Sequence, residues 1–137
     1  MEKPNGKKPN ATAKEYMLGR GISEDVLEKH AILDEYSFSG SRLPAVGFPY
    51  RDRSGDVTSI KWRSADKTKR FSQQNVCEDF FNIEQYKKGN DLLICEGEVD
   101  ALSWMSADLP SNVTVVSIPN GAPPKVRDGK IDPADDN

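Results

Sequence analysis

The 137-residue sequence has few of the residues that metal clusters, disulfide scaffolds and membrane spans require. It contains two cysteines, Cys77 and Cys95, no Cys-x-x-Cys pair, and a single histidine, His30. This argues against a zinc site and makes a disulfide a poor expectation. Cys95 lies within an apolar run and is expected to pack as a small hydrophobic residue. His30 ends a helical pattern, where a structural role is expected.

Long apolar stretches are missing as well. No run approaches the ~20 residues of a membrane-spanning helix, and the N-terminal MEKPNGKKPN has no apolar segment typical of a signal peptide. We therefore expect a cytoplasmic protein. The length suits one compact domain with room for a small N-terminal subdomain.

Charge is unevenly distributed along the chain. The net charge of −3 argues against indiscriminate binding to nucleic acid. Residues 51–70, however, carry seven basic residues against three aspartates, and residues 71–109 carry eight acids against two lysines. A basic segment next to an acidic one favours a site that handles both a polyanion and a cation.

The sequence pattern predicts an α/β protein whose N-terminal region is α+β. Thr12 and Glu15 form a capping box for a helix that ends near Leu18, and Ser23 is a candidate N-cap for a second helix. The predicted divisions are a flexible tail (1–11), a helical hairpin and linker (12–42), an antiparallel basic β subdomain (43–90), the first half of a parallel unit (91–124), and a loop or disordered tail (125–137).

Alternating residues predict three antiparallel strands, from Leu43 to Tyr50, over residues 57–64 and over residues 69–73. RDRSGD and ADKT supply the turns between them. In the second strand, Ile60 and Trp62 share one face and Lys61 and Arg63 share the other.

Two apolar runs, DLLICEG and NVTVVSIP, flank the helical segment EVDALSWMSA. Strands that are apolar on both faces and joined by a helix indicate a parallel βαβ unit. Functional groups collect beyond the carboxyl ends of such strands, where Glu96 and the pair Asn120-Gly121 fall. Asn-Gly is also a common turn pair, so an ordinary turn stays open there. The segment after Pro119 is loop-like, which indicates either a piece of a longer protein or a naturally shortened one.

Taken in order, the segments RGIS, GFPYRDRSG, IKWRSADKTKRF, LLICEGEVDALS and VVSIPNGAP resemble one known domain. This is the RNA-polymerase domain of bacteriophage and mitochondrial-type primase-helicases, whose second half is a Toprim fold. The resemblance spans roughly residues 14–124. It implies a DNA primase, a nucleotidyltransferase that joins ribonucleotides into a primer on single-stranded DNA with Mg²⁺.

The resemblance implies that Glu96 ligates the metal and that Asp100, one helical turn on, supports it. Hard divalent cations prefer carboxylate oxygens on a rigid element, and phosphoryl transfer needs their charge. The alternative is that Glu96 is an acid favoured by the helix dipole. Glu98 is expected to point elsewhere. No strand ending in the family's Asp-x-Asp pair follows Gly121, so the Mg²⁺ site is expected to be incomplete and the chain inactive by itself.

Basic residues on the predicted hairpin form the second candidate site, because Lys and Arg suit phosphate contacts. The alternative is an ordinary solvated face. Phe71, Trp62 and Tyr50 could stack on bases, although Trp62 is expected in the core. The candidate nucleotide- and DNA-binding residues are Lys61, Arg63, Lys67, Lys69 and Arg70.

The predicted function is thus a fragment of a primase catalytic domain from a phage or phage-derived replication protein. Its predicted partners are single-stranded DNA, ribonucleoside triphosphates and a helicase module on the same or another chain, in a bacterial host or phage-infected cell. The alternatives are a non-catalytic nucleic-acid-binding Toprim-like module, another Toprim activity such as nuclease or topoisomerase chemistry, and a replisome adaptor.

Overall fold

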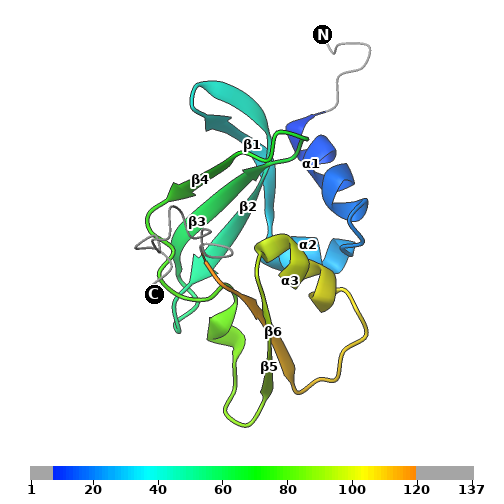
Figure 1. The fold of residues 1–137 in the computed structure, drawn as a ribbon, viewed down its shortest axis with the longest axis vertical. Helices are drawn as coiled ribbons and strands as arrows, with labels where there is room; N and C mark the ends of the chain where they lie inside the picture. Colours follow the sequence, from blue (N-terminus) through cyan, green and yellow to red (C-terminus); the bar gives the residue numbers. More distant parts are fainter. Residues whose placement is uncertain (1–7, 120–137) are drawn as a thin grey trace, which may run out of the picture.

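The computed structural model describes residues 8–119, which form an antiparallel sheet of four strands and a parallel pair of strands (Figure 1). The mixed α/β class predicted from the sequence is confirmed. The elements, in chain order, are α1 (Pro9–Leu18), α2 (Glu24–His30), β1 (Ile32–Phe38), β2 (Ser41–Arg51), β3 (Val57–Ser64), β4 (Phe71–Gln74), the 3₁₀ turn η1 (Ile83–Gln85), β5 (Asp91–Cys95), α3 (Glu98–Met105) and β6 (Val113–Ser117).

The two N-terminal helices form as a hairpin, with one predicted cap wrong and one confirmed. α1 begins at Pro9 and its N-cap is Lys8, so the expected start at Thr12 is wrong. Proline suits the first turn of a helix because its missing N–H would be unpaired there anyway. Ser23 caps α2 as predicted, and its hydroxyl accepts a hydrogen bond from the Val26 amide at 3.3 Å.

The antiparallel sheet has the strand order β1-β2-β3-β4. β3 has the predicted bounds, and Gly55 supplies the turn before it with a φ of +89°. The linker expected up to residue 42 is wrong for residues 32–38, because these residues pair with β2 as strand β1. β4 begins at Phe71, later than expected, since Lys69 adopts a left-handed conformation with a φ of +52°.

The two faces of β3 point into different surroundings, as its alternation predicted. Trp62 packs with Phe38 and Ala45 in a small cluster on one face of the sheet. Lys61 and Arg63 lie on the other face, which is also the face of the buried residues Val46, Phe48 and Tyr50 of β2. Helix α1 packs on β1 and β2. The basic residues of β3 therefore point toward the interior of the molecule.

The parallel pair, β5 and β6, is joined by α3 in the predicted βαβ arrangement. Val99 and Leu102 of α3 are buried in the main core, with Met105 partly buried against it. The expectation that β5 is covered on both faces is wrong within residues 8–119. Leu92 and Ile94 are 41% and 54% exposed.

One core joins both sheets. Its buried members come from α1, α2, β2, α3, β5 and β6, and they include Met17, Leu27, Phe48, Cys95 and Leu102. Cys77 and Cys95 are buried free thiols, so Cys95 packs as a small hydrophobic residue as expected. None of the helices in the described part of the chain has the length and apolar content to cross a membrane.

Candidate nucleotide- and nucleic-acid-binding cleft

A cleft of about 550 Å³ lies between strand β3, strand β4 with the turn before it, and the turn that joins β5 to α3. Four basic residues and three acids, distant in sequence, line this one space. The charged lining residues are Arg20, Lys61, Arg63, Lys69, Glu96, Glu98 and Asp100. A site that combines a polyanion and a cation needs both signs of charge close together, and this cleft provides both.

The acids of the cleft come from the end of β5 and the first turn of α3. Glu96 directly follows β5, and Gly97 is the N-cap of α3. Glu96 and Asp100 are exposed and line the cleft, as expected for residues that bind a ligand. Their positions leave both carboxylates free to meet solvent or a cation.

Glu98 lies in the opposite environment and is only 5% exposed. Its Oε2 atom lies 2.7 Å from the Nζ atom of Lys61, and the Tyr50 hydroxyl donates a hydrogen bond to the same oxygen. The expectation that Glu98 points away from the site is wrong. The cause is the long β2–β3 hairpin, which carries Tyr50 and Lys61 against the start of α3. Burial raises the pKa of Tyr50, and the neighbouring Glu98 carboxylate raises it further.

Lys61 is a buried member of the cleft wall, with 8% of its side chain exposed. Besides its ion pair, the ammonium donates a hydrogen bond to the carbonyl oxygen of Pro119, just past β6. Lys61 thus links β3 to both ends of the α3–β6 segment.

Arg63 is held between two aromatic rings. Its guanidinium carbon lies 5.8 Å from the Tyr16 ring centroid and 5.6 Å from the Phe71 ring centroid, and its Nη2 donates to the Tyr16 hydroxyl at 2.9 Å. Arg20 packs on the Tyr16 ring as well, at 5.5 Å. Cation–π contacts of this kind orient guanidinium groups. The result is a wall in which Arg20, Tyr16, Arg63 and Phe71 follow one another.

The other predicted basic residues differ in position. Lys69 lines the cleft, whereas Lys67 is exposed in the turn before it and is not among the lining residues. Arg70 is directed toward β1, where its Nη1 donates to the Phe38 carbonyl at 3.5 Å.

The predicted ADKT turn is present. Burial would raise the pKa of Asp66, but hydrogen bonds from Thr68 and Ser64 outweigh this and lower it.

Of the three aromatic residues proposed to stack on bases, Phe71 has the position for it. It is 57% exposed and lines the cleft. Trp62 is buried as expected, stacked on Tyr36 at 4.8 Å, with its indole N–H donating to Gln74. Tyr50 is buried and bonded to Glu98.

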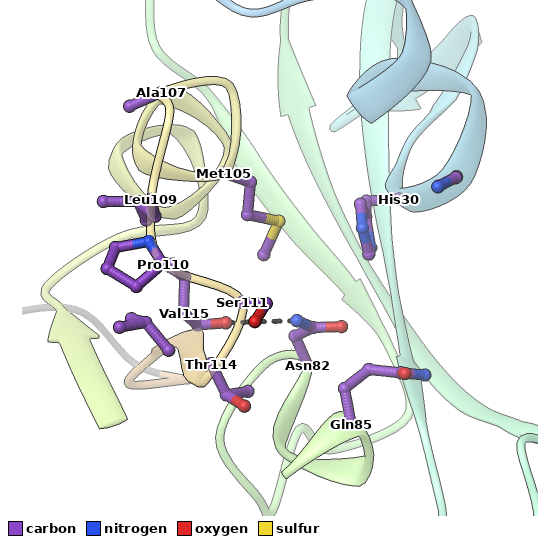
Figure 2. Close-up of a pocket in the computed structure, with 12 residues that line it drawn as sticks. His30, Asn82, Gln85, Met105, Ala107, Leu109, Pro110, Ser111, Thr114 and Val115 are labelled. Carbon is purple, nitrogen blue, oxygen red and sulfur yellow. Dashed lines mark hydrogen bonds between the residues drawn. The ribbon is translucent and has the colours of Figure 1, made fainter. Parts of the chain in front are cut away.

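A second hollow, of about 540 Å³, lies away from the cleft, between α2, η1, the loop after α3 and the start of β6 (Figure 2). Asn82 donates from its amide nitrogen to the Val115 carbonyl at 3.1 Å. His30 reaches toward Asn82 from α2 (Figure 2). Burial lowers the pKa of His30, and the positive charges of Lys29 and Arg51 lower it further. Both effects disfavour the protonated form of the His30 ring.

Divalent metal could be held by Glu96 and Asp100. Within residues 8–119, no group of three or more His, Cys, Asp or Glu side chains converges as a ready-made metal site. Mg²⁺, however, keeps several waters and often uses one or two protein carboxylates together with substrate phosphates. Two exposed carboxylates beside a basic wall fit that kind of site.

Sequence reasoning missed Arg20, Tyr16 and Glu98 as members of the site, and it gave Tyr50 a stacking role in place of its hydrogen bond to Glu98. Arg20 stands in the segment RGIS, which contributed to the resemblance, so its position could have been a signal. Glu98 carries no local signal, because its partner Lys61 is 37 residues earlier in the sequence. The pair Asn120-Gly121 and the acids Asp132, Asp135 and Asp136 lie outside the described residues.

Comparison with known proteins finds similarity of the chain to primase and primase-helicase proteins. No family model matches the chain. The chain is 30% identical over 122 residues to the Twinkle homolog protein, chloroplastic/mitochondrial, of Arabidopsis thaliana, covering 89% of this chain and 16% of that protein. The crystal structure of the primase fragment of the bacteriophage T7 primase-helicase protein matches with a TM-score of 0.59 and 27% identity, over 76% of this chain and 42% of that one.

A further T7 structure contains the lagging-strand DNA polymerase, primase domains of two gp4 subunits, an RNA/DNA hybrid and dTTP. It matches with a TM-score of 0.58 and 28% identity, covering 77% of this chain and 46% of that chain. The fold is therefore that of primase cores. The chain is similar to the N-terminal part of the primase domain of phage and mitochondrial-type primase-helicases, which confirms the resemblance seen in the sequence. It spans about a sixth of the plant protein's length.

Proposed function

We propose that the chain forms the first part of a primase catalytic domain, and that its cleft binds single-stranded DNA and ribonucleoside triphosphates for primer synthesis. The observation that carries this proposal is the meeting of the basic wall and the acid turn in one cleft. The similarity to T7 primase domains, which were solved in a complex with DNA polymerase, an RNA/DNA hybrid and dTTP, supports a role next to nucleic acid.

Each part of the cleft takes a separate task. Arg20, Arg63 and Lys69 attract and hold phosphates, with Arg63 preset by its two ring contacts. The exposed face of Phe71 offers a stacking surface for a base. Lys67 and Arg70 lie outside this wall, where they would contact a strand that extends beyond the cleft.

Glu96, supported by Asp100, would hold Mg²⁺ beside the phosphates. When bound, the metal neutralises charge on the reacting phosphate oxygens. The chain's own residues hold the nucleotide against the acid turn, and the ends of β5 and α3 keep both carboxylates in place. Catalysis and a helicase partner are proposed for the whole protein of which this chain is part, in the cytoplasm of a bacterial or phage-infected cell.

The test is binding of fluorescein-labelled single-stranded DNA, followed by fluorescence anisotropy at several salt concentrations. Three wall cations predict a slope of log affinity against log salt of about −2, since each phosphate contact contributes about −0.7 on single strands. Lys69→Ala and Arg20→Ala should each weaken binding and lower the slope. Arg53→Ala, an exposed arginine in the β2–β3 turn, is the matched control and should leave both unchanged.

A second titration separates catalytic from purely binding function. Glu96→Gln should abolish Mg²⁺-dependent binding of ATP and leave affinity for single-stranded DNA intact. If Mg²⁺ strengthens ATP binding equally in both proteins, the metal role of Glu96 is wrong and a non-catalytic nucleic-acid-binding module is the better description. If the unaltered chain binds neither ligand, the proposed function is wrong and a role as a replisome adaptor comes first.

A further inference from the structure

Lys61 differs from the other basic residues of the cleft because its ammonium is held by buried and half-buried partners. The Lys61 ammonium, from β3, contacts the Glu98 carboxylate of α3 and the Pro119 carbonyl that follows β6. Tyr50 of β2 joins this cluster through its hydrogen bond to Glu98. Both charged side chains are more than nine-tenths buried. Two charges are taken out of water only at considerable cost, which well-placed partners must offset.

The Lys61 ammonium has one more N–H donor than it has partners in the structure. A lysine ammonium has three N–H donors. One is directed to Glu98 and one to Pro119. Because Lys61 lines the cleft, the third can reach an oxygen of a bound ligand. The ammonium is thereby aimed by its partners, in contrast to a surface lysine whose long side chain moves freely.

The Glu98 carboxylate also neutralises the charge of Lys61, so the pair exerts little long-range attraction on a ligand in solution. Long-range attraction of a polyanion then comes from Arg20, Arg63 and Lys69, while the Lys61–Glu98 pair is close to neutral as seen from solution. The Lys61 N–H acts only at hydrogen-bond range.

We propose that Glu98 is a positioning residue: it holds the Lys61 ammonium at the inner wall of the cleft so that one N–H meets a phosphate oxygen of the bound nucleotide. This inference rests on the proposed nucleotide-binding function. It assigns Glu98 a role separate from that of Glu96, although the two acids are two residues apart. Tyr50 supports Glu98 by donating to the same carboxylate oxygen.

Glu98→Gln distinguishes positioning from simple charge neutralisation by the sign of its effect. The probe is inorganic triphosphate without divalent metal, so that Glu96 plays no part. If Glu98 only cancels charge, its removal makes the cleft more positive and strengthens triphosphate binding. If Glu98 positions Lys61, binding weakens about five- to tenfold despite the gained charge, the size of one charge-assisted hydrogen bond. Glu28→Gln, the same change at an exposed site on α2, is the control and should leave the affinity unchanged.

The ammonium itself supplies a readout that needs no ligand. A buried, hydrogen-bonded ammonium exchanges its protons slowly, so Lys61 should give a resolved ¹⁵Nζ–¹H NMR signal, assigned by its loss in Lys61→Met. That signal should disappear in Glu98→Gln while far-UV circular dichroism stays unchanged. Tyr50→Phe, which keeps the ring and removes the donor, should weaken the signal and serves as the second variant if Glu98→Gln does not fold.

Persistence of the signal in Glu98→Gln, or tighter triphosphate binding by that variant, would overturn the proposal. Failure of the unaltered chain to bind triphosphate would instead count against the proposed function. In that case the NMR signal still decides whether Glu98 holds Lys61.

Discussion

Residues of the same type have different roles in this chain because their burial differs. Glu96 and Glu98 are two positions apart, yet Glu96 faces the cleft and Glu98 is enclosed with Lys61. The sequence singles out Glu96 as a candidate through its place after an apolar strand and through the family resemblance. It could not identify Glu98, because a buried ion pair depends on which distant residue the fold brings opposite. A lysine or arginine on a strand is ordinarily read as exposed, and Lys61 and Arg63 are not.

Between pH 7.5 and 5 we expect His30 to be the main cause of any change in the free energy of unfolding with pH. His30 is the sole histidine of the sequence, and its pKa in the folded chain is lowered from the ordinary value of 6.5 by burial and by Lys29 and Arg51. Below pH 6.5 the unfolded chain binds a proton that the folded chain resists, so the free energy of unfolding falls as pH falls. His30→Gln should remove this decline between pH 7.5 and 5.

The measurement is urea unfolding at half-unit pH steps. In the unaltered chain stability should drop through this window, and in His30→Gln the curve should be flatter. Asp66, whose pKa is also lowered, loses its contribution only at lower pH and does not interfere. Equal slopes for the two proteins would show that His30 is not held neutral.

At the scale of elements, local patterns predicted the helix cap at Ser23, the bounds of β3 and the βαβ unit. Strand β1 was missed. Its segment, ILDEYSF, carries acids in the middle and borders a helix, and it is a strand because β2 pairs along its whole length. β2 follows β1 directly across a two-residue turn at Ser39-Gly40, where both residues have positive φ, so the Ser-Gly pair was a local turn signal for this hairpin. The exposed face of β5 has a different cause, because a strand's burial depends on what packs against it.

Gly47 of β2 lies opposite Trp62 of β3, whose ring covers it. A Cβ atom there would lie 3.0 Å from ring atoms of Trp62, closer than carbon atoms pack. Trp62 is itself fixed between Tyr36 and Gln74. Gly47→Ala should therefore destabilise the chain by about 1–3 kcal/mol, the usual cost of overpacking.

Denaturant unfolding and near-ultraviolet circular dichroism of the tryptophan bands would show this change. Gly97→Ala introduces the same methyl group where no atom lies within 4 Å, and as a helix N-cap it should cost only a few tenths of a kcal/mol. Similar losses for the two variants would mean that Trp62 moves aside without cost.

For the whole molecule, the shared core joins the antiparallel sheet to the parallel unit. We therefore expect both to unfold in one transition. The two tryptophans report on separate parts: Trp62 in the antiparallel sheet and Trp104, 49% exposed, on α3. In each single-tryptophan variant, Trp62→Phe and Trp104→Phe, the fluorescence and far-UV dichroism transitions should coincide. Separate midpoints within either variant would show that the two sheets unfold independently.

A cleft whose two walls share a core has its charged groups in place before any ligand arrives. The Arg63 guanidinium is fixed between two rings, and the Lys61 ammonium is fixed by the Glu98 carboxylate and the Pro119 carbonyl. Freezing such long side chains at the moment of binding would cost conformational entropy, and here folding has already met that cost. Preorganisation of this kind links affinity to stability: a core substitution far from the cleft that loosens either wall should weaken binding without removing a single contact to the ligand.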